Sequence, residues 1–166
     1  MKIGVCGTQG TGKTTYALQL AQDMKKKHPD KTVYCCQENI ISCPFPINRD
    51  SSQLSTMWIF SDLLKTELDA MSKFGITVTD RTVIDPVVYA KAHGFPELAE
   101  AMYQVVKEYV STYDIIYFLD KSRCYAYDDG TRDTNDTYRS NIHDGFLEIF
   151  WRLMADGKNV NFERIG

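Results

Sequence analysis

Residues 7–15 read Gly-Thr-Gln-Gly-Thr-Gly-Lys-Thr-Thr and match the phosphate-binding loop pattern G-x-x-x-x-G-K-[ST]. The apolar segment 2–6 leads directly into this stretch, and residues with helical spacing follow it. Glycines allow the backbone to turn its N–H groups toward one point, and the start of a following helix adds further unpaired N–H groups. The stretch therefore predicts a loop that binds the phosphates of a nucleoside triphosphate.

The residues of this loop have separate expected roles. Lys13 is expected to reach the β- and γ-phosphates, and the Thr14 hydroxyl is expected to hold Mg²⁺. The cofactors predicted from the loop are therefore ATP or GTP, together with Mg²⁺. The residues predicted to contact the nucleotide are Gly7, Thr8, Gln9, Gly10, Thr11, Gly12, Lys13, Thr14 and Thr15.

Length and composition narrow the class of protein. With 166 residues, the chain is expected to form a single domain over residues 1–166, and its 43% hydrophobic and 25% charged residues are typical of an ordinary soluble protein. The net charge of −3 argues against broad binding to a polyanion, although a local basic groove stays open. Five cysteines without a C-x-x-C pair indicate reduced thiols. No signal peptide or long apolar run occurs, so we expect a cytoplasmic protein without a membrane segment.

Strand and helix patterns alternate along the chain. Strands are predicted at 2–6, 32–36, 76–79, 115–119 and 159–162, with helical patterns between them. This alternation predicts an α/β fold whose parallel sheet is covered by helices on both faces. The helix after residues 50–52 is expected to bury Met57, Phe60, Leu64, Leu68 and Met71.

Polar groups follow two of the predicted strands, at the sheet edge where ligands bind in such folds. Asp80 ends the third strand, where a carboxylate would hold Mg²⁺ directly or through water; the alternative is a plain turn residue. Arg81 beside it is expected to bind polar groups or a phosphate of the acceptor. Glu38 follows the second strand and is a candidate base, or else an exposed loop glutamate.

The polar stretch at about 120–140 is predicted to be a lid. A phosphoryl-transfer enzyme must exclude water and place positive charge over the transferred group. Arg132 and Arg139 are the predicted catalytic arginines, and Arg123 is a weaker third. The alternative is a solvated loop whose arginines pair with its own aspartates. Packing or surface roles are expected for the tyrosines and histidines, with base stacking as an alternative for the tyrosines: Tyr125, Tyr127, Tyr138, His28, His93 and His143.

Together these motifs resemble the small P-loop kinases allied to ribosylnicotinamide kinase. The residues that carry the resemblance are 7–15, Glu38, 43–48, 58–60, 80–82, Asp85, Tyr89 and 129–132. The resemblance implies the P-loop NTPase fold with a five-stranded parallel sheet, a Mg²⁺-nucleotide donor and an arginine-bearing lid. It makes Glu38 the leading base and Asp80 with Arg81 the metal and acceptor pair. Trp58 and Asp85 join Glu38 and Arg81 as expected substrate-binding residues.

The sequence thus predicts a kinase that moves the γ-phosphoryl group of ATP or GTP to a hydroxyl of a nucleoside- or nucleotide-type acceptor. The resembling group includes phage enzymes that phosphorylate the hydroxymethyl group of 5-hydroxymethyluracil in DNA, and such a base is one expected acceptor. Free nucleosides, ribosylnicotinamide and deoxynucleoside monophosphates are the alternative. A triphosphate-hydrolysing switch would share the loop but would need no acceptor pocket. An oligomer is compatible with all of these.

Overall fold

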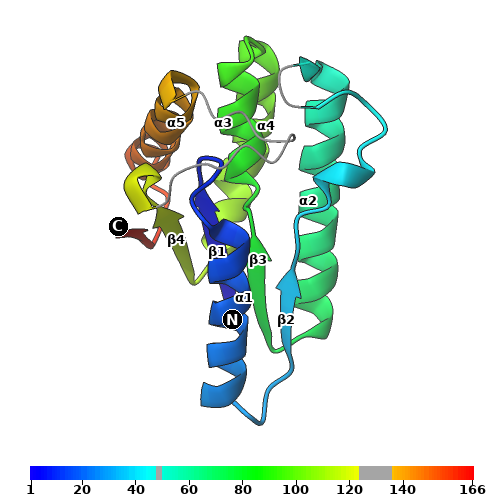
Figure 1. The fold of residues 1–166 in the computed structure, drawn as a ribbon, viewed down its shortest axis with the longest axis vertical. Coiled ribbons are helices and arrows are strands. Elements are labelled where there is room, and N and C mark those ends of the chain that lie inside the picture. The colour runs from blue at the N-terminus through cyan, green and yellow to red at the C-terminus, as the bar shows by residue number, and fades with distance from the viewer. Residues whose placement is uncertain (48–49, 124–135) are drawn as a thin grey trace.

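The computed structural model describes residues 1–47, 50–123 and 136–166. Each strand is followed by at least one helix before the next strand, and two α-helices lie between the third and fourth strands (Figure 1). The strands are β1 (Lys2–Gly7), β2 (Val33–Cys36), β3 (Ile76–Asp80), β4 (Ile115–Leu119) and β5 (Phe162–Ile165). The helices are α1 (Lys13–Lys27), α2 (Gln53–Lys73), α3 (Ile84–Ala92), α4 (Pro96–Tyr109) and α5 (Asp136–Ala155), with short 3₁₀ helices η1 (Ile40–Ser42), η3 (Val110–Thr112) and η4 (Lys121–Arg123).

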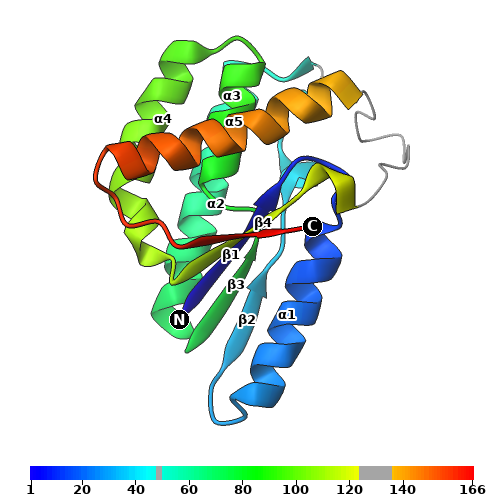
Figure 2. The same cartoon turned by 90° about the vertical axis from the view of Figure 1, so that its left-hand side faces the viewer.

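The five strands form one sheet in the order β2-β3-β1-β4-β5, and every neighbouring pair is parallel. Helix α1 packs on one face, while α3, α4 and α5 cover the other, as Figure 2 shows. Because both faces are covered, all six residues of the central strand β1 are buried. The prediction of an α/β fold with a five-stranded parallel sheet is confirmed, and this is the architecture of the P-loop NTPases. None of the described helices has the length and apolar character needed to cross a membrane.

The fifth strand lies three residues later than predicted. The sequence suggested residues 159–162, whereas β5 begins at Phe162, whose ring stacks on Phe150 at a centroid distance of 4.3 Å. The two following residues, Glu163 and Arg164, are exposed at the edge of the sheet. Because so few positions of β5 are buried, it has no apolar run that would mark its ends in the sequence. Its bounds are determined instead by its pairing with β4.

Helix α2 turns a different face to the core than the apolar spacing predicted. Its Ser52 cap and the capping box with Ser55 are present. However, Met57 and Leu68 are each 50% exposed and Met71 is 37% exposed. The buried side chains of α2 are Ser55, Thr56, Phe60, Leu63, Glu67 and Ala70.

An ion pair explains the orientation of α2. Glu67 is 1% exposed, and its Oε2 lies 2.5 Å from Nζ of Lys2, which is itself buried at the start of β1. The Tyr113 hydroxyl donates to the same carboxylate at 2.7 and 2.8 Å, and Nζ of Lys2 also donates to Thr112 at 3.0 Å. Burial raises the pKa of Glu67 and lowers that of Lys2, and their mutual attraction opposes both shifts. The charged residue Glu67 therefore occupies a buried position of α2, where helical periodicity predicts an apolar side chain.

Replacing Glu67 by glutamine is expected to lower the free energy of unfolding by about 3 kcal/mol, because it leaves a buried ammonium without its anion. Urea denaturation measures this change. The matched control is Asp69→Asn, which removes an exposed ion pair with Lys65 on the same helix and should change stability by no more than about 0.5 kcal/mol. Equal losses in both variants would contradict a stabilising role for the buried pair.

Candidate active site

The loop between β1 and α1 has the conformation of an anion cradle. Gly7, Gly10 and Gly12 all have positive φ, at 143°, 74° and 79°. At Gly7 a Cβ atom would lie only 2.7 Å from the carbonyl oxygen of Leu119, so no larger residue fits there. Gly12 is the N-cap of α1, whose first residue is Lys13. The loop therefore presents the start of α1 at the carboxyl edge of the sheet.

Lys13 lies folded against this loop. Its Nζ donates to the carbonyl oxygen of Thr8 at 2.8 Å, and the Thr11 hydroxyl donates to the same oxygen at 2.9 Å. Burial, together with the nearby Arg81 guanidinium, lowers the pKa of Lys13 to about 8, while surrounding carboxylates oppose that shift. A bound polyphosphate would supply the negative charge that this buried ammonium lacks.

Thr14 and Asp80 form a pair of oxygen ligands beside the loop. Asp80 is the last residue of β3 and is 2% exposed, and the Thr14 side chain hydrogen-bonds to its carboxylate. Burial raises the pKa of Asp80, and the Thr14 hydrogen bond opposes this. Within the described residues, Oδ1 of Asp80 is buried without a hydrogen-bond partner. These oxygens fit Mg²⁺, which usually takes one or two protein ligands and completes its shell with phosphate and water.

The part of the chain that the structure describes has no group of three or more His, Cys, Asp or Glu side chains arranged to hold a metal. A magnesium ion at Thr14 and Asp80 would therefore depend on a phosphate as a further ligand. This is the arrangement expected of a metal that arrives with a nucleotide.

Arg81 is held between two carboxylates. Its Nε pairs with Oε1 of Glu38, and its Nη1 lies 3.3 Å from Oδ1 of Asp85. The other oxygen of Asp85 accepts hydrogen bonds from the backbone N–H and the hydroxyl of Thr82, each at 2.9 Å. The structure thus brings together three residues predicted from the sequence to bind substrate.

The backbone of Arg81 is strained. Its φ is 84°, and it is the one non-glycine residue with a positive φ in the described parts of the chain. Such a conformation costs on the order of 1–3 kcal/mol and is typical of functional sites. Its N–H donates to the carbonyl oxygen of Val5 at 2.9 Å, which fixes this turn to the central strand. The strained turn directs the guanidinium toward Glu38 and Asp85.

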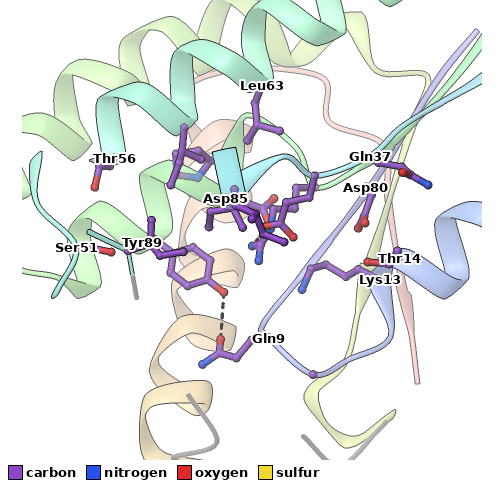
Figure 3. A pocket seen from close by; sticks show the side chains of 18 of the residues that line it. Gln9, Lys13, Thr14, Gln37, Ser51, Thr56, Leu63, Asp80, Asp85 and Tyr89 are labelled. Carbon is purple, nitrogen blue, oxygen red and sulfur yellow. Dashed lines mark hydrogen bonds and ion pairs between the residues drawn. The ribbon is translucent and has the colours of Figure 1, made fainter. Parts of the chain in front are cut away.

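A cavity of about 650 Å³ connects these groups. Figure 3 shows Lys13, Thr14 and Asp80 on one side of it, with Ser51, Thr56 and Tyr89 on the opposite side. The apolar part of the lining is contributed by branched aliphatic side chains, a proline and two tyrosine rings: Ile40, Ile41, Ile47, Ile59, Leu63, Pro86, Tyr89 and Tyr138. The cavity can therefore hold a polyphosphate at one end and a largely apolar body at the other.

Gln9 links the phosphate loop to helices α3 and α5, which pack against each other beside the cavity. Its Oε1 accepts a hydrogen bond from the Tyr89 hydroxyl of α3 at 3.1 Å, drawn as a dashed line in Figure 3. Its carbonyl oxygen accepts one from Nε of Arg139 on α5 at 3.2 Å. The loop is thus held from α3 through the Gln9 side chain and from α5 through its backbone.

The described arginines of the predicted lid, and Trp58, do not lie where their expected roles would put them. Arg139 is 6% exposed and bonds the carbonyl oxygens of Gln9 and Lys121, so it braces the loop. Arg123 lies over the Tyr16 ring at 5.0 Å. Trp58 does not line the large cavity but borders a small hollow beside Glu38 and Arg81. The remaining lid predictions lie outside the described residues: Arg132, Tyr125, Tyr127 and the segment 129–131.

Several lining residues have no clear sequence signal. His93, expected to be an ordinary packing or surface residue, lines the cavity, and its Nε2 lies 2.8 Å from the Tyr138 hydroxyl. Burial lowers the pKa of His93. His93, the C-cap of α3, follows Asp85 and Tyr89 at intervals of four, so the two residues already named from the sequence could have pointed to it. The scattered isoleucines carry no comparable pattern.

Replacing Tyr89 by phenylalanine is expected to weaken triphosphate binding about fivefold, because a hydrogen bond of about 1 kcal/mol no longer holds Gln9 in place. Isothermal titration calorimetry with MgATP measures the effect. Tyr34→Phe is the matched control, since Tyr34 stacks on Phe74 and does not line the cavity. Unchanged affinity in Tyr89→Phe would show that this contact does not support the loop.

Comparisons with known proteins agree with this geometry. The sequence family described as "AAA domain" matches residues 2–160. The chain is similar in structure to deoxyadenosine kinase from M. mycoides, with a TM-score of 0.65 and 14% identity over 100% of this chain and 90% of that one. It is also similar to thymidylate kinase from Ehrlichia chaffeensis, with a TM-score of 0.61 and 19% identity over 99% of this chain and 86% of that one. No curated protein sequence matches it.

Proposed function

This chain belongs to the AAA domain family, and from that premise we propose that it is a kinase. It transfers the γ-phosphoryl group of ATP or GTP to a hydroxyl of a nucleoside- or nucleotide-type small molecule. The observation that carries the proposal is the cavity itself. One continuous space joins the phosphate loop to a carboxylate–arginine cluster, which a protein that only hydrolyses triphosphate does not need.

The residues of the cavity divide the work of phosphoryl transfer. The loop N–H groups and Lys13 bind the donor phosphates and offset the charge that spreads over the transferred group. Thr14 and Asp80 would hold Mg²⁺, which would supply positive charge to neutralise the same group. Glu38 accepts the proton of the acceptor hydroxyl, and Arg81 keeps the Glu38 carboxylate in place through their ion pair.

The proposal takes a free small molecule as the acceptor. The similar structures are, by their descriptions, kinases of deoxyadenosine and thymidylate. They favour a free nucleoside or nucleotide over the hydroxymethyl group of a base in DNA. The net charge of −3 also favours a small acceptor, since a DNA substrate is best served by a basic groove. Membership of the ribosylnicotinamide-kinase-like group stays a prediction.

Transfer of labelled phosphate from ATP to a panel of acceptors tests the proposal. The panel contains ribosylnicotinamide, the common nucleosides and deoxynucleosides, their monophosphates, and DNA that contains 5-hydroxymethyluracil. We expect a labelled product whose formation requires a small-molecule acceptor. Phosphate release at the full rate without any acceptor would identify a hydrolysing switch. Labelled phosphate on DNA, and on no small molecule, would identify a base in DNA as the acceptor.

A further inference from the structure

The described residues of the acceptor half of the cavity carry more negative than positive charge. The described residues that line the whole cavity include three carboxylates, Glu38, Asp80 and Asp85, and two permanent or near-permanent cations, Lys13 and Arg81. Lys13 belongs to the donor end, where it faces the phosphate loop. At the acceptor end, the described lining therefore has one positive group, the Arg81 guanidinium, and two negative groups, Glu38 and Asp85.

The Arg81 guanidinium already forms ion pairs with two carboxylates. Arg81 is 14% exposed in its side chain and is paired with Glu38 through Nε and with Asp85 through Nη1. Tyr89 lies beside it, with its ring centroid 5.5 Å from the guanidinium carbon. An acceptor phosphate, which has a charge of about −1.5 to −2 at neutral pH, would have to share the Arg81 guanidinium with two carboxylates, and both would repel it.

Among the described residues, the wall beyond Arg81 is largely apolar and contains no Lys or Arg. Ile40, Ile47, Ile59 and Leu63 line it, and the polar side chains of the same cavity include Thr56, Tyr138 and His93. The Thr56 hydroxyl already donates to the carbonyl oxygen of Ser52 at 3.0 Å. An uncharged ring system would bury apolar area there without leaving a charged group unpaired.

From this charge distribution we infer that the acceptor is an uncharged or cationic nucleoside, and that a nucleoside monophosphate is rejected. The inference rests on the proposed kinase function and selects between its two acceptor classes. The ring system lies against the isoleucine wall, and the reacting hydroxyl is next to Glu38. The hydroxyl oxygen bonds to the γ-phosphorus of the donor as the bond from that phosphorus to the β-bridging oxygen breaks. The hydroxyl proton passes to Glu38, and the diphosphate leaves.

A panel of matched pairs tests this inference. Each ribonucleoside, each deoxynucleoside and ribosylnicotinamide is assayed against its own 5′-monophosphate with labelled ATP as donor. For every nucleoside that accepts phosphate, we expect kcat/KM for its monophosphate to be lower by about 100-fold. Equal or better transfer to a monophosphate overturns the inference but leaves the kinase assignment intact. No transfer to any member, with ATP still bound, overturns the kinase assignment as well.

A charge-removing variant provides a second, independent measurement. Asp85→Asn leaves an oxygen that can accept from Thr82 but removes one of the two anions that hold Arg81. We expect the preference for nucleoside over monophosphate to fall about tenfold in this variant. The control is Asp69→Asn, which removes the same charge from an exposed position on α2 and should leave the preference unchanged. An unaltered preference in Asp85→Asn overturns the account of Arg81.

Discussion

Alanine in place of Lys13 is expected to reduce phosphoryl transfer about 1,000-fold or more. In the free protein the Lys13 ammonium is buried against the loop and donates to the carbonyl oxygen of Thr8. In the complex it would be the cation nearest the donor phosphates, where charge builds up in the transition state. Steady-state transfer assays with labelled ATP measure the loss.

Two controls separate this effect from simple unfolding. Lys65→Ala removes an ammonium from an exposed position on α2 and should leave turnover at the level of the unmodified protein. Thermal unfolding of Lys13→Ala should show a folded protein, since Thr11 still ties the loop to the oxygen of Thr8. Full activity in Lys13→Ala would mean that the loop binds no substrate phosphate.

Glutamine in place of Glu38 is expected to lower kcat by about 10²- to 10⁴-fold, the range that general-base catalysis supplies. Glutamine retains the shape of the side chain but cannot take the proton of the acceptor hydroxyl. The affinity for MgATP should change little, because Glu38 lies beyond the second strand and not in the phosphate loop. Single-turnover kinetics and calorimetry measure the two quantities separately.

The conservative variant Glu38→Asp provides the matched comparison. It keeps a carboxylate that can pair with Arg81, although one methylene shorter, and should recover part of the rate lost in Glu38→Gln. The result that would contradict the assignment is weakened ATP binding together with intact turnover in Glu38→Gln. In that case the carboxylate would act on the donor rather than on the acceptor.

The donor end of the site could be predicted from the sequence because its signal is local. The loop of residues 7–15 depends on glycines at fixed spacing, and Asp80 ends a strand of β-branched residues, 76–79. The parallel sheet then brings Asp80 beside Thr14. Such features need only short-range patterns and the rule that ligands meet the carboxyl ends of strands.

The acceptor wall and several packing details depend on contacts between distant segments. Helix α3 is buried nearly all round, so it has no amphipathic period, and the sequence did not predict it. The predicted face of α2 was right at Phe60 and Leu64 but wrong at Met57, Leu68 and Met71. Glu67 is buried there instead, because it pairs with Lys2, a partner 65 positions away in the chain. The isoleucines of η1 and α2 line one cavity only after both segments have folded over β3.

Tyr89 and Arg139 both hydrogen-bond to Gln9, so one residue connects the acceptor side of the cavity to the phosphate loop. A molecule that settles against Tyr89 acts on the same hydrogen bond that shapes the loop for the triphosphate. If occupancy of one site changes affinity at the other, reciprocity requires the reverse effect to have equal size. Any synergy or antagonism between the two substrates would therefore be transmitted through the hydrogen bonds of Gln9.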